Sequence, residues 1–366
     1  MFFYDIPNLL VILIIVIISF RMGLIPLWLS FFLGLFAFVP FILNDVLFPA
    51  SFMPDQFSYF TKVQKLRSFD LELVTNFKLQ VSSWMLAAIP MPYAETIKSL
   101  GFFSRFMATV LIIWLYAYKK LRGWPLLLIL FYPSFLLYSS LALRDTLVFM
   151  FMIISVILFL ENRRMLALLI ASPLFIIKFQ NFFLVIIFFI VHLFFSKGSL
   201  FQRHRYVFLT FVLAALAPFI MTIIELLDLY RRALFVDDGG FLDSYTPIKT
   251  IEDFIVLASQ SAPYFLMKPL PWEANSFLQL IQSLENIAIA TFLFFIFSKA
   301  SQVDKSIAFK WMVYTFISFS VYGLVVFNFG TAVRYKFPFI LIVVTGIAYE
   351  LYLRYGTVIS NKGDRS

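Results

Sequence analysis

The sequence predicts an all-α polytopic integral membrane protein, because it combines a very apolar composition with few charges and long apolar runs. Hydrophobic residues make up 62% of the 366 and charged residues only 13%, and the mean hydropathy is +0.93. A soluble domain carries roughly 25% charged residues, so most apolar side chains here must face lipid or pack between helices. The unbroken apolar runs favour helices over a β-barrel, whose strands would alternate.

The apolar runs define the membrane spans. A spanning helix needs about 20 predominantly apolar residues, and about eleven stretches come close to that length, with a margin of one or two. They lie near residues 9–20, 24–48, 102–118, 125–141, 146–160, 165–177, 182–195, 207–227, 277–297, 311–327 and 337–353.

Short basic loops set the expected orientation, since such loops stay in the cytoplasm. Counting spans outward from Lys119, Lys120 and Arg122 places five further basic groups on the same side. These are Arg21, the pair Arg163 and Arg164, the loop with Lys197, Arg203 and Arg205, the loop with Lys299, Lys305 and Lys310, and the tail with Arg354, Lys362 and Arg365. The sequence therefore predicts a multi-pass protein of the bacterial inner (cytoplasmic) membrane, with a periplasmic N-terminus and a cytoplasmic C-terminus.

The N-terminal run lacks the basic region and cleavage site of a signal peptide, so we expect the first helix to be retained. The net charge of +9 lies between the spans. This placement favours the phosphates of membrane lipid as partners and argues against nucleic acid.

The chain is expected to form a single transmembrane domain over residues 1–366. Two long segments lie on its outer side. Residues 49–101 form the first periplasmic segment, with an interfacial or re-entrant helix, because a full crossing there would reverse the Lys119 loop. Residues 228–275 form a large periplasmic loop, which ends in the run SAPYFLMKPLPWE.

Many basic residues fall on the outer side, against the usual enrichment of Lys and Arg in cytoplasmic loops. By this topology 14 of the 29 Lys and Arg face outward: Lys62, Lys65, Arg67, Lys78, Lys98, Arg105, Arg144, Lys178, Arg231, Arg232, Lys249, Lys268, Arg334 and Lys336. A cation at membrane depth costs several kcal/mol unless it is paired or hydrated, so it is often functional. An outward cluster of Arg suggests an anionic ligand such as a phosphate or diphosphate.

The candidate ligands among these cations also have structural interpretations. Arg144 could pair with Asp145, and Arg334 and Lys336 could anchor a helix start at the interface. Lys178 could belong to a polar hairpin, and Arg231 could begin a solvated loop face.

Missing residue types exclude several chemistries. There is no cysteine, and His192 and His204 fall near the cytoplasmic side. An outward metal site built on His and an outward Ser/His/Asp triad are therefore excluded. No nucleotide-binding motif is present, and we expect neither a cofactor nor a metal. An outward general base would have to be a carboxylate or, less favourably, a tyrosine.

Four short motifs resemble a known family. YPSFLLYSSLALRDTLVF (132–149) is similar to its aromatic-Ser-Ser motif followed by a basic residue and Asp, and KPLPWE (268–273) resembles its Pro-aromatic-Pro-Trp-Glu motif. AVRYKFPFI (332–340) looks like its C-terminal Arg-aromatic-basic element, and Asp55 with Tyr59 resembles its Asp-x-x-x-Tyr pattern. Together they resemble Wzy-type polymerases of O-antigen or capsule repeat units. Leu270, Tyr138 and Arg144 are mild departures from the usual side chains.

The resemblance implies a GT-C-like fold and a metal-independent glycosyltransferase. Donor and acceptor would be oligosaccharides on undecaprenyl diphosphate, and a polysaccharide chain-length regulator would be a possible partner. It implies diphosphate binding by Arg144, Arg334 and Lys178, assisted by Lys336 or Arg231. The catalytic base would be Asp55, Glu273 or Asp145, and Tyr59 and Trp272 would stack against sugars.

Two other functions stay open on the sequence. One is a different membrane glycosyltransferase that uses lipid-linked sugars. The other is a flippase of lipid-linked oligosaccharide, which would also need a cationic cavity. Flippases often contain an internal repeat, and the sequence shows none.

Overall fold

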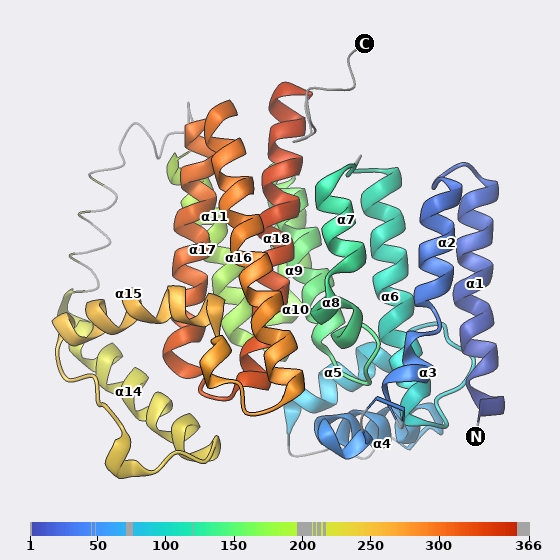
Figure 1. Ribbon diagram of the computed structural model, residues 1–366, viewed down its shortest axis with the longest axis horizontal. Coiled ribbons are helices and arrows are strands. Elements are labelled where there is room, and N and C mark those ends of the chain that lie inside the picture. The colour runs from blue at the N-terminus through green and yellow to red at the C-terminus, as the bar shows by residue number, and fades with distance from the viewer. Residues whose placement is uncertain are drawn as a thin grey trace. The chain divides into compact units, whose positions relative to one another are not determined.

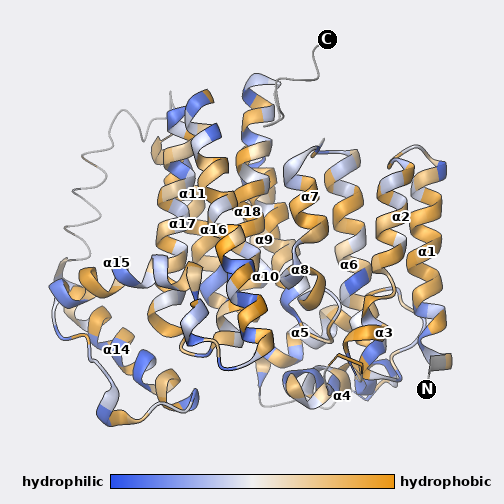
Figure 2. Ribbon diagram, in the orientation of Figure 1, coloured by the Kyte–Doolittle hydropathy of each residue, from blue (hydrophilic) through white to orange (hydrophobic). Residues whose placement is uncertain are grey.

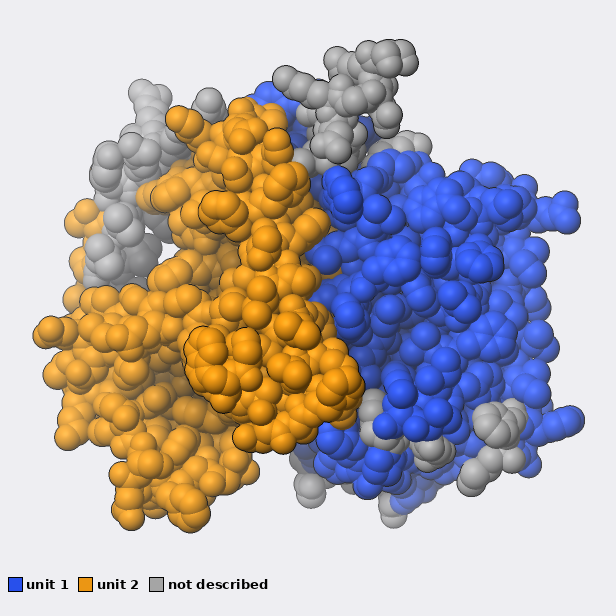
Figure 3. All heavy atoms as spheres, viewed as in Figure 1, with its two compact units in different colours: residues 1–185, 348–366 blue, residues 186–347 orange. Residues whose placement is uncertain are grey.

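The computed structural model consists of helices and connecting turns. It describes residues 2–356 except 45, 48, 71–75, 120, 196–206, 208–209, 211–213 and 215–216. No strand occurs in that part of the chain, so the prediction of an all-α fold is confirmed for it. The chain divides into two compact units, unit 1 (residues 1–185 and 348–366) and unit 2 (186–347), which are coloured separately in Figure 3. Both boundaries fall inside helices. The prediction of one transmembrane domain stays a prediction.

Unit 1 holds the N-terminal helices and the last turns of the final one. Its helices are α1 (Ile6–Arg21), α2 (Leu27–Phe36), α3 (Val39–Leu43), α4 (Asp55–Arg67), α5 (Phe77–Ala87), α6 (Ile97–Ala117), α7 (Trp124–Phe131), α8 (Pro133–Tyr138), α9 (Asp145–Leu160), α10 (Arg164–Ile177) and the start of α11 (Phe179–Phe195). Within this unit α1 packs against α2 and α6, α6 packs against α9, and α9 packs against α10.

Unit 2 holds the remaining helices. They are the end of α11, α14 (Ile220–Asp237), α15 (Ile251–Met267), α16 (Phe277–Val303), α17 (Lys305–Val325) and most of α18 (Phe329–Tyr355). The helix α17 is central, since α14, α15 and α16 all contact it. Gly346 on α18 allows the ring of Trp311 on α17 to pack directly against the α18 backbone, because a Cβ at that position would lie 2.1 Å from the ring.

Four of the described helices are long and apolar enough to cross a membrane: α6, α16, α17 and α18. The stretches 6–21, 27–43, 145–160, 164–177 and 179–195 are shorter apolar helices, and Figure 2 shows the apolar colouring of α1, α2 and α6 along most of their lengths. A helical membrane protein is therefore supported. The number of eleven spans and the GT-C arrangement stay predictions.

Several expected spans differ from the helices in detail. The stretch 24–48 is split between α2 and α3, and 125–141 is split at Tyr132, because Pro133 has no N–H to continue the ladder of α7. The stretch 207–227 lies partly outside the described residues, and its described end belongs to α14, which continues to Asp237. The last helix begins at Phe329 rather than near residue 337. Arg334 and Lys336 therefore lie within α18 and not at its start.

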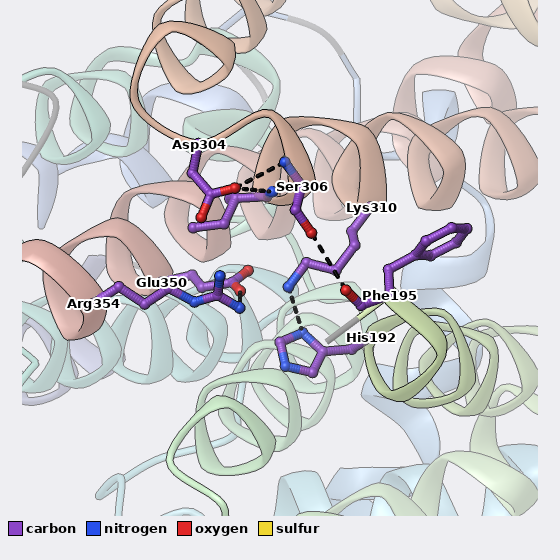
Figure 4. Close-up of polar contacts among 8 residues, drawn as sticks. His192, Phe195, Asp304, Ser306, Lys310, Glu350 and Arg354 are labelled. Atoms are coloured by element: carbon purple, nitrogen blue, oxygen red, sulfur yellow. Dashed lines mark hydrogen bonds and ion pairs between the residues drawn. The ribbon is translucent and has the colours of Figure 1, made fainter. Parts of the chain in front are cut away.

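Polar contacts fix the ends of these helices. Asp5, at 1% exposure, accepts hydrogen bonds from the hydroxyls of Thr96 and Ser99, both at 2.7 Å, which ties the start of α1 to the start of α6. In unit 2, the Oδ1 of Asp304 accepts from the backbone N–H of Ser306 at 2.8 Å and so caps α17 (Figure 4). A buried carboxylate that accepts such bonds is satisfied and fixes helix position.

His192 belongs to the same region of unit 2. Its Nδ1 lies 3.4 Å from the Nζ of Lys310 (Figure 4). His204 lies outside the described residues.

The two segments expected on the outer side contain helices. The first holds α4 and α5, which lie at the end of unit 1 away from the turn between α6 and α7 (Figure 1). The 11 residues of α5 span about 16 Å, too short for a hydrocarbon core of about 30 Å. The second segment holds the end of α14 and the whole of α15.

Candidate functional site

In unit 1 the candidate site is the turn 139–144 that precedes α9. The helix α6 holds one side of it: Arg105 Nη1 donates to the Oγ of Ser139 at 2.9 Å, and the Oγ of Ser104 donates to the carbonyl of Leu143 at 3.2 Å. A Cβ at Gly101 would lie 2.5 Å from the carbonyl oxygen of Ser140. Only glycine therefore allows the helix to approach the turn this closely.

A pair of amides holds the other side of the turn. Gln56 Oε1 accepts from the backbone N–H of Ala142 and from the Nδ2 of Asn44, both at 3.1 Å. Gln56 Nε2 donates back to the Oδ1 of Asn44 at 3.3 Å, and Gln56 is fully buried. These bonds fix the turn relative to the first turn of α4.

Two predicted motifs meet at this turn. The guanidinium carbon of Arg144 lies 6.0 Å from the ring centre of Tyr59, at the outer limit of a cation–π contact. Asp55 is exposed and begins α4 one turn before Tyr59. Asp145 is buried and begins α9, where the helix dipole favours a carboxylate. The structure thus brings Arg144 and the buried Tyr59 together in unit 1, with Asp55 one helical turn before Tyr59 on α4.

Arg105 is the most unusual residue of this cluster. Its side chain is 0% exposed, and it lies 5.5 Å from the ring centre of Phe36. Its Nε and Nη2 have no hydrogen-bond partner among the described residues, and the same holds for the Oγ of Ser140 and the Nε of Arg144. Buried donors without partners are rare in folded proteins and indicate a water, an ion or a functional role.

Lys178 is the last predicted cation of unit 1. It follows α10 directly, is 7% exposed, and its carbonyl accepts from the backbone N–H of Asn181 at 2.9 Å. Asn181 in turn donates to the sulfur of Met152 on α9, at 2.9 Å. The polar hairpin between α10 and α11 therefore exists, and a ligand role for Lys178 stays a prediction.

In unit 2 the candidate site surrounds the end of α15. Lys336 Nζ, on α18, donates to the carbonyls of Leu266 and Lys268 at 2.8 and 2.9 Å and to the Oδ1 of Asn286 at 2.7 Å. Asn286 Nδ2 also donates to the carbonyl of Lys268, at 2.8 Å. All three ammonium protons of Lys336 have acceptors, so this side chain holds α15, α16 and α18 together.

The segment after α15 carries the predicted residues Glu273 and Trp272. Glu273 accepts from the hydroxyl of Tyr264 at 2.8 Å and from the backbone N–H of Leu270 at 2.9 Å. Burial and this hydrogen bond raise the pKa of the Tyr264 hydroxyl. Trp272 is 79% exposed. Glu273 therefore stabilises its own turn, while Trp272 is accessible to a ligand.

The remaining predicted cations of unit 2 differ in their surroundings. Arg231 donates from Nε to the carbonyl of Leu324 at 3.0 Å and from Nη1 to the carbonyl of Thr246. Its guanidinium also lies 4.9 Å from the ring centre of Tyr245. Arg231 therefore fixes the connection between α14 and α15. Arg334 is half-buried and lies two residues before Lys336 on α18.

The structure adds three polar residues that were absent from the predicted site. Arg105 was noted as an outward cation without a role, and Gln56 and Asn286 were not singled out. A buried Arg inside an apolar run signals such a site, because a charge there is costly. Gln56 and Asn286 give no comparable signal, since uncharged amides occur in loops and helix faces throughout the chain.

No group of three or more His, Asp or Glu able to hold a metal occurs among the described residues. Comparisons of the chain with protein-family models, curated proteins and solved structures found no match.

Proposed function

We propose that this chain is a membrane glycosyltransferase of the Wzy type, which polymerises lipid-linked oligosaccharide repeat units at the periplasmic face of the bacterial inner membrane. The observation that carries this proposal is the pairing of distant motifs. In unit 1 Arg144 lies beside Tyr59, and in unit 2 Lys336 bonds to the carbonyl of Lys268. Within each unit, residues from motifs that are distant in the sequence lie close together, and this supports the proposal.

The proposed reaction transfers a glycan between two lipids. A hydroxyl of the acceptor attacks the anomeric carbon of the donor, a glycosidic C–O bond forms, and the bond to undecaprenyl diphosphate breaks. Negative charge develops on the leaving diphosphate, which a preorganised guanidinium stabilises. Arg144 is the best placed for this role, because it is half-buried and its Nε has no partner among the described residues.

The acceptor proton needs a carboxylate within hydrogen-bond reach. Asp55 is favoured over the other two candidates, because it is exposed on the same helix as Tyr59. Glu273 already accepts hydrogen bonds from Tyr264 on α15 and from Leu270 in its own turn, and Asp145 is 3% exposed. In unit 2, Trp272 is 79% exposed and would supply an aromatic face for a sugar ring, whereas Tyr59 in unit 1 is only 6% exposed.

The orientation has support within unit 1. Lys119 forms an ion pair with Glu161, which joins the ends of α6 and α9, and Tyr349 donates to the same carboxylate at 2.6 Å. The basic residues near these ends therefore collect at one end of the unit, and the end with α4 and Asp55 lies opposite (Figure 1). The basic end would be cytoplasmic and the Asp55 end periplasmic.

The test is complementation of a gene deletion in the native host. We expect Arg144→Ala and Asp55→Asn to restore only single repeat units, and Arg144→Lys to restore a weakened ladder. Arg163→Ala is the matched control, because this side chain is 66% exposed and its contact with Glu161 is 3.8 Å long. The readouts are the surface polysaccharide ladder on a gel and expression by immunoblot.

Two outcomes would contradict the proposal. A deletion strain that lacks even single surface repeat units, and accumulates lipid-linked units inside, would indicate a flippase. Full ladders with Arg144→Ala at normal expression would remove Arg144 from the diphosphate site.

A further inference from the structure

A second polar site lies at the opposite end of unit 1 from Asp55. A pocket of about 360 Å³ opens between the turn 23–26, which joins α1 to α2, and the end of α6. Tyr116 and Arg122 line it, and no carboxylate is among its lining residues. A pocket of this volume is large enough for a phosphate group and its ester oxygens.

Arg122 is held in position within this pocket. Its Nη1 donates to the carbonyl of Tyr116 at 2.5 Å and to that of Leu121 at 3.2 Å. Its guanidinium carbon also lies 3.2 Å from the ring centre of Tyr116. Its Nε and Nη2 form no hydrogen bond to any residue that the structure describes. One edge of the guanidinium is thus fixed by the protein, and two donors remain for an oxyanion, which a guanidinium binds in a bidentate manner.

The surroundings of the pocket are those of a membrane interface. Trp28, Tyr118 and Trp124 lie within two residues of pocket-lining residues in the sequence. Their side chains are 42%, 64% and 48% exposed. Amphipathic rings of this kind gather at the headgroup level of a bilayer. Arg21 is also exposed, at the end of α1.

The charge of this end selects the ligand. Basic pockets between transmembrane helices on the cytoplasmic side bind the headgroups of anionic lipids. Burial lowers the pKa of the Arg122 guanidinium, and the two tyrosines Tyr116 and Tyr352 oppose that shift. An arginine nonetheless keeps its charge in proteins, so the pocket offers a permanent cation at headgroup depth.

We propose that this pocket binds the phosphate of an anionic membrane phospholipid, with Arg122 as the residue that contacts the phosphate oxygens. Tyr116 orients the guanidinium, and the turn 23–26 forms the opposite wall. Gly23 is favoured in this wall because its φ is +68°, a conformation that other residues rarely adopt. The site is independent of the proposed glycosyl transfer.

Lipid retention by the purified full chain tests this site. The protein is exchanged into micelles with equal amounts of phosphatidylglycerol and phosphatidylcholine, and bound lipid is counted by native mass spectrometry. We expect wild type to retain phosphatidylglycerol at least tenfold over phosphatidylcholine, Arg122→Gln to lose most of this preference, and Arg122→Lys to keep part of it. Arg163→Gln, an exposed arginine at the same end, should behave as wild type.

Three results decide the proposal. Equal preference in wild type and Arg122→Gln would overturn it. A competition arm with inorganic phosphate separates the sources: displacement of the lipid by millimolar phosphate would overturn the assignment to a phospholipid, and retention of the lipid supports it. If Arg122→Gln fails to fold, the variants Arg122→Lys and Tyr116→Leu are tested instead. A wild-type preference for phosphatidylglycerol in both of them would overturn the site.

Discussion

Arg105 in unit 1 and Lys336 in unit 2 are both buried cations, but their surroundings differ. Lys336 donates three hydrogen bonds to neutral acceptors, two carbonyls and the amide of Asn286. Arg105 donates only one, to Ser139, and two of its nitrogens have no partner among the described residues. An unsatisfied buried donor costs stability, whereas a satisfied one contributes to it. Removing the charge of Lys336 should therefore lower stability, whereas removing the charge of Arg105 should not.

The largest expected effect is at Lys336. Replacing it with Met keeps the volume but removes the lysine donor from the carbonyl of Leu266 and from the Oδ1 of Asn286, while the carbonyl of Lys268 keeps its bond from Asn286 Nδ2. We expect the free energy of unfolding to fall by about 2–4 kcal/mol, as measured by chemical unfolding in detergent micelles. Lys249→Met, at an exposed position, is the control and should stay within about 0.5 kcal/mol of wild type. Unchanged stability of Lys336→Met would show that these acceptors do not depend on the lysine.

A smaller loss of stability is expected at Asn286, which accepts a hydrogen bond from Lys336. Asn286→Leu removes one of the three acceptors of Lys336 and also the donor to the carbonyl of Lys268. We expect a loss of about 1–3 kcal/mol. In a double-mutant cycle with Lys336→Met, the two losses should be clearly less than additive, because the residues share these bonds. Additive losses would contradict a joint role.

Lys268 is a third buried cation, and its contribution to the stability of the fold should depend on pH. Its Nζ donates to the carbonyl of Val326 at 3.1 Å. Burial lowers its pKa to about 8, although Glu273 and Asp238 oppose that shift. In the unfolded chain the pKa of a lysine is about 10.4. Between these values the unfolded state binds more protons, so stability should rise with pH.

The measurement compares the melting temperatures of wild type and Lys268→Met from pH 7 to 10.5. The difference, wild type minus variant, should be constant below about pH 8 and should increase from there toward pH 10. Lys249→Met, at an exposed position, again serves as the control for replacing a lysine with Met. A flat difference for Lys268→Met would contradict the lowered pKa.

The smallest effect, with the opposite sign, is expected at Arg105. Arg105→Met removes a buried charge with unsatisfied donors, so stability should be unchanged or higher by about 1 kcal/mol. At the same time the polysaccharide ladder should shorten if Arg105 serves the site beside Arg144. If Arg105→Met lost as much stability as Lys336→Met, the proposed difference between a satisfied and an unsatisfied buried cation would be wrong.

Much of the fold follows from the sequence, because apolar runs of sufficient length have few alternatives to helices in a bilayer. The start of α18 was missed for a physical reason. Arg334 and Lys336 lower the local hydropathy, but Lys336 is satisfied by groups from α15 and α16, and the helix continues through it to Phe329. The break after α7 was readable from Pro133 in principle, although the surrounding leucines hide it in a hydropathy average.

The candidate site was predictable only in part. Tyr59 and Arg144 come from two different motifs and lie near each other in the structure. The sequence did not distinguish cations that could bind a ligand from cations that only hold helices together. Arg67 illustrates the difficulty, since its guanidinium donates to the carbonyls of Ala87, Ile89 and Met91 at the end of α5. Such carbonyl partners come from tertiary structure, and no local pattern in the sequence encodes them.

Gly101 limits how the turn before α9 can evolve. The carbonyl of Ser140 occupies the space of a Cβ on α6, so every other residue at position 101 would push the turn away. In a saturation library, this position should therefore tolerate no replacement, although no reacting group lies there. Deep mutational data would therefore make Gly101 look like an active-site residue. Its contribution is only that it has no Cβ, which leaves room for the carbonyl of Ser140.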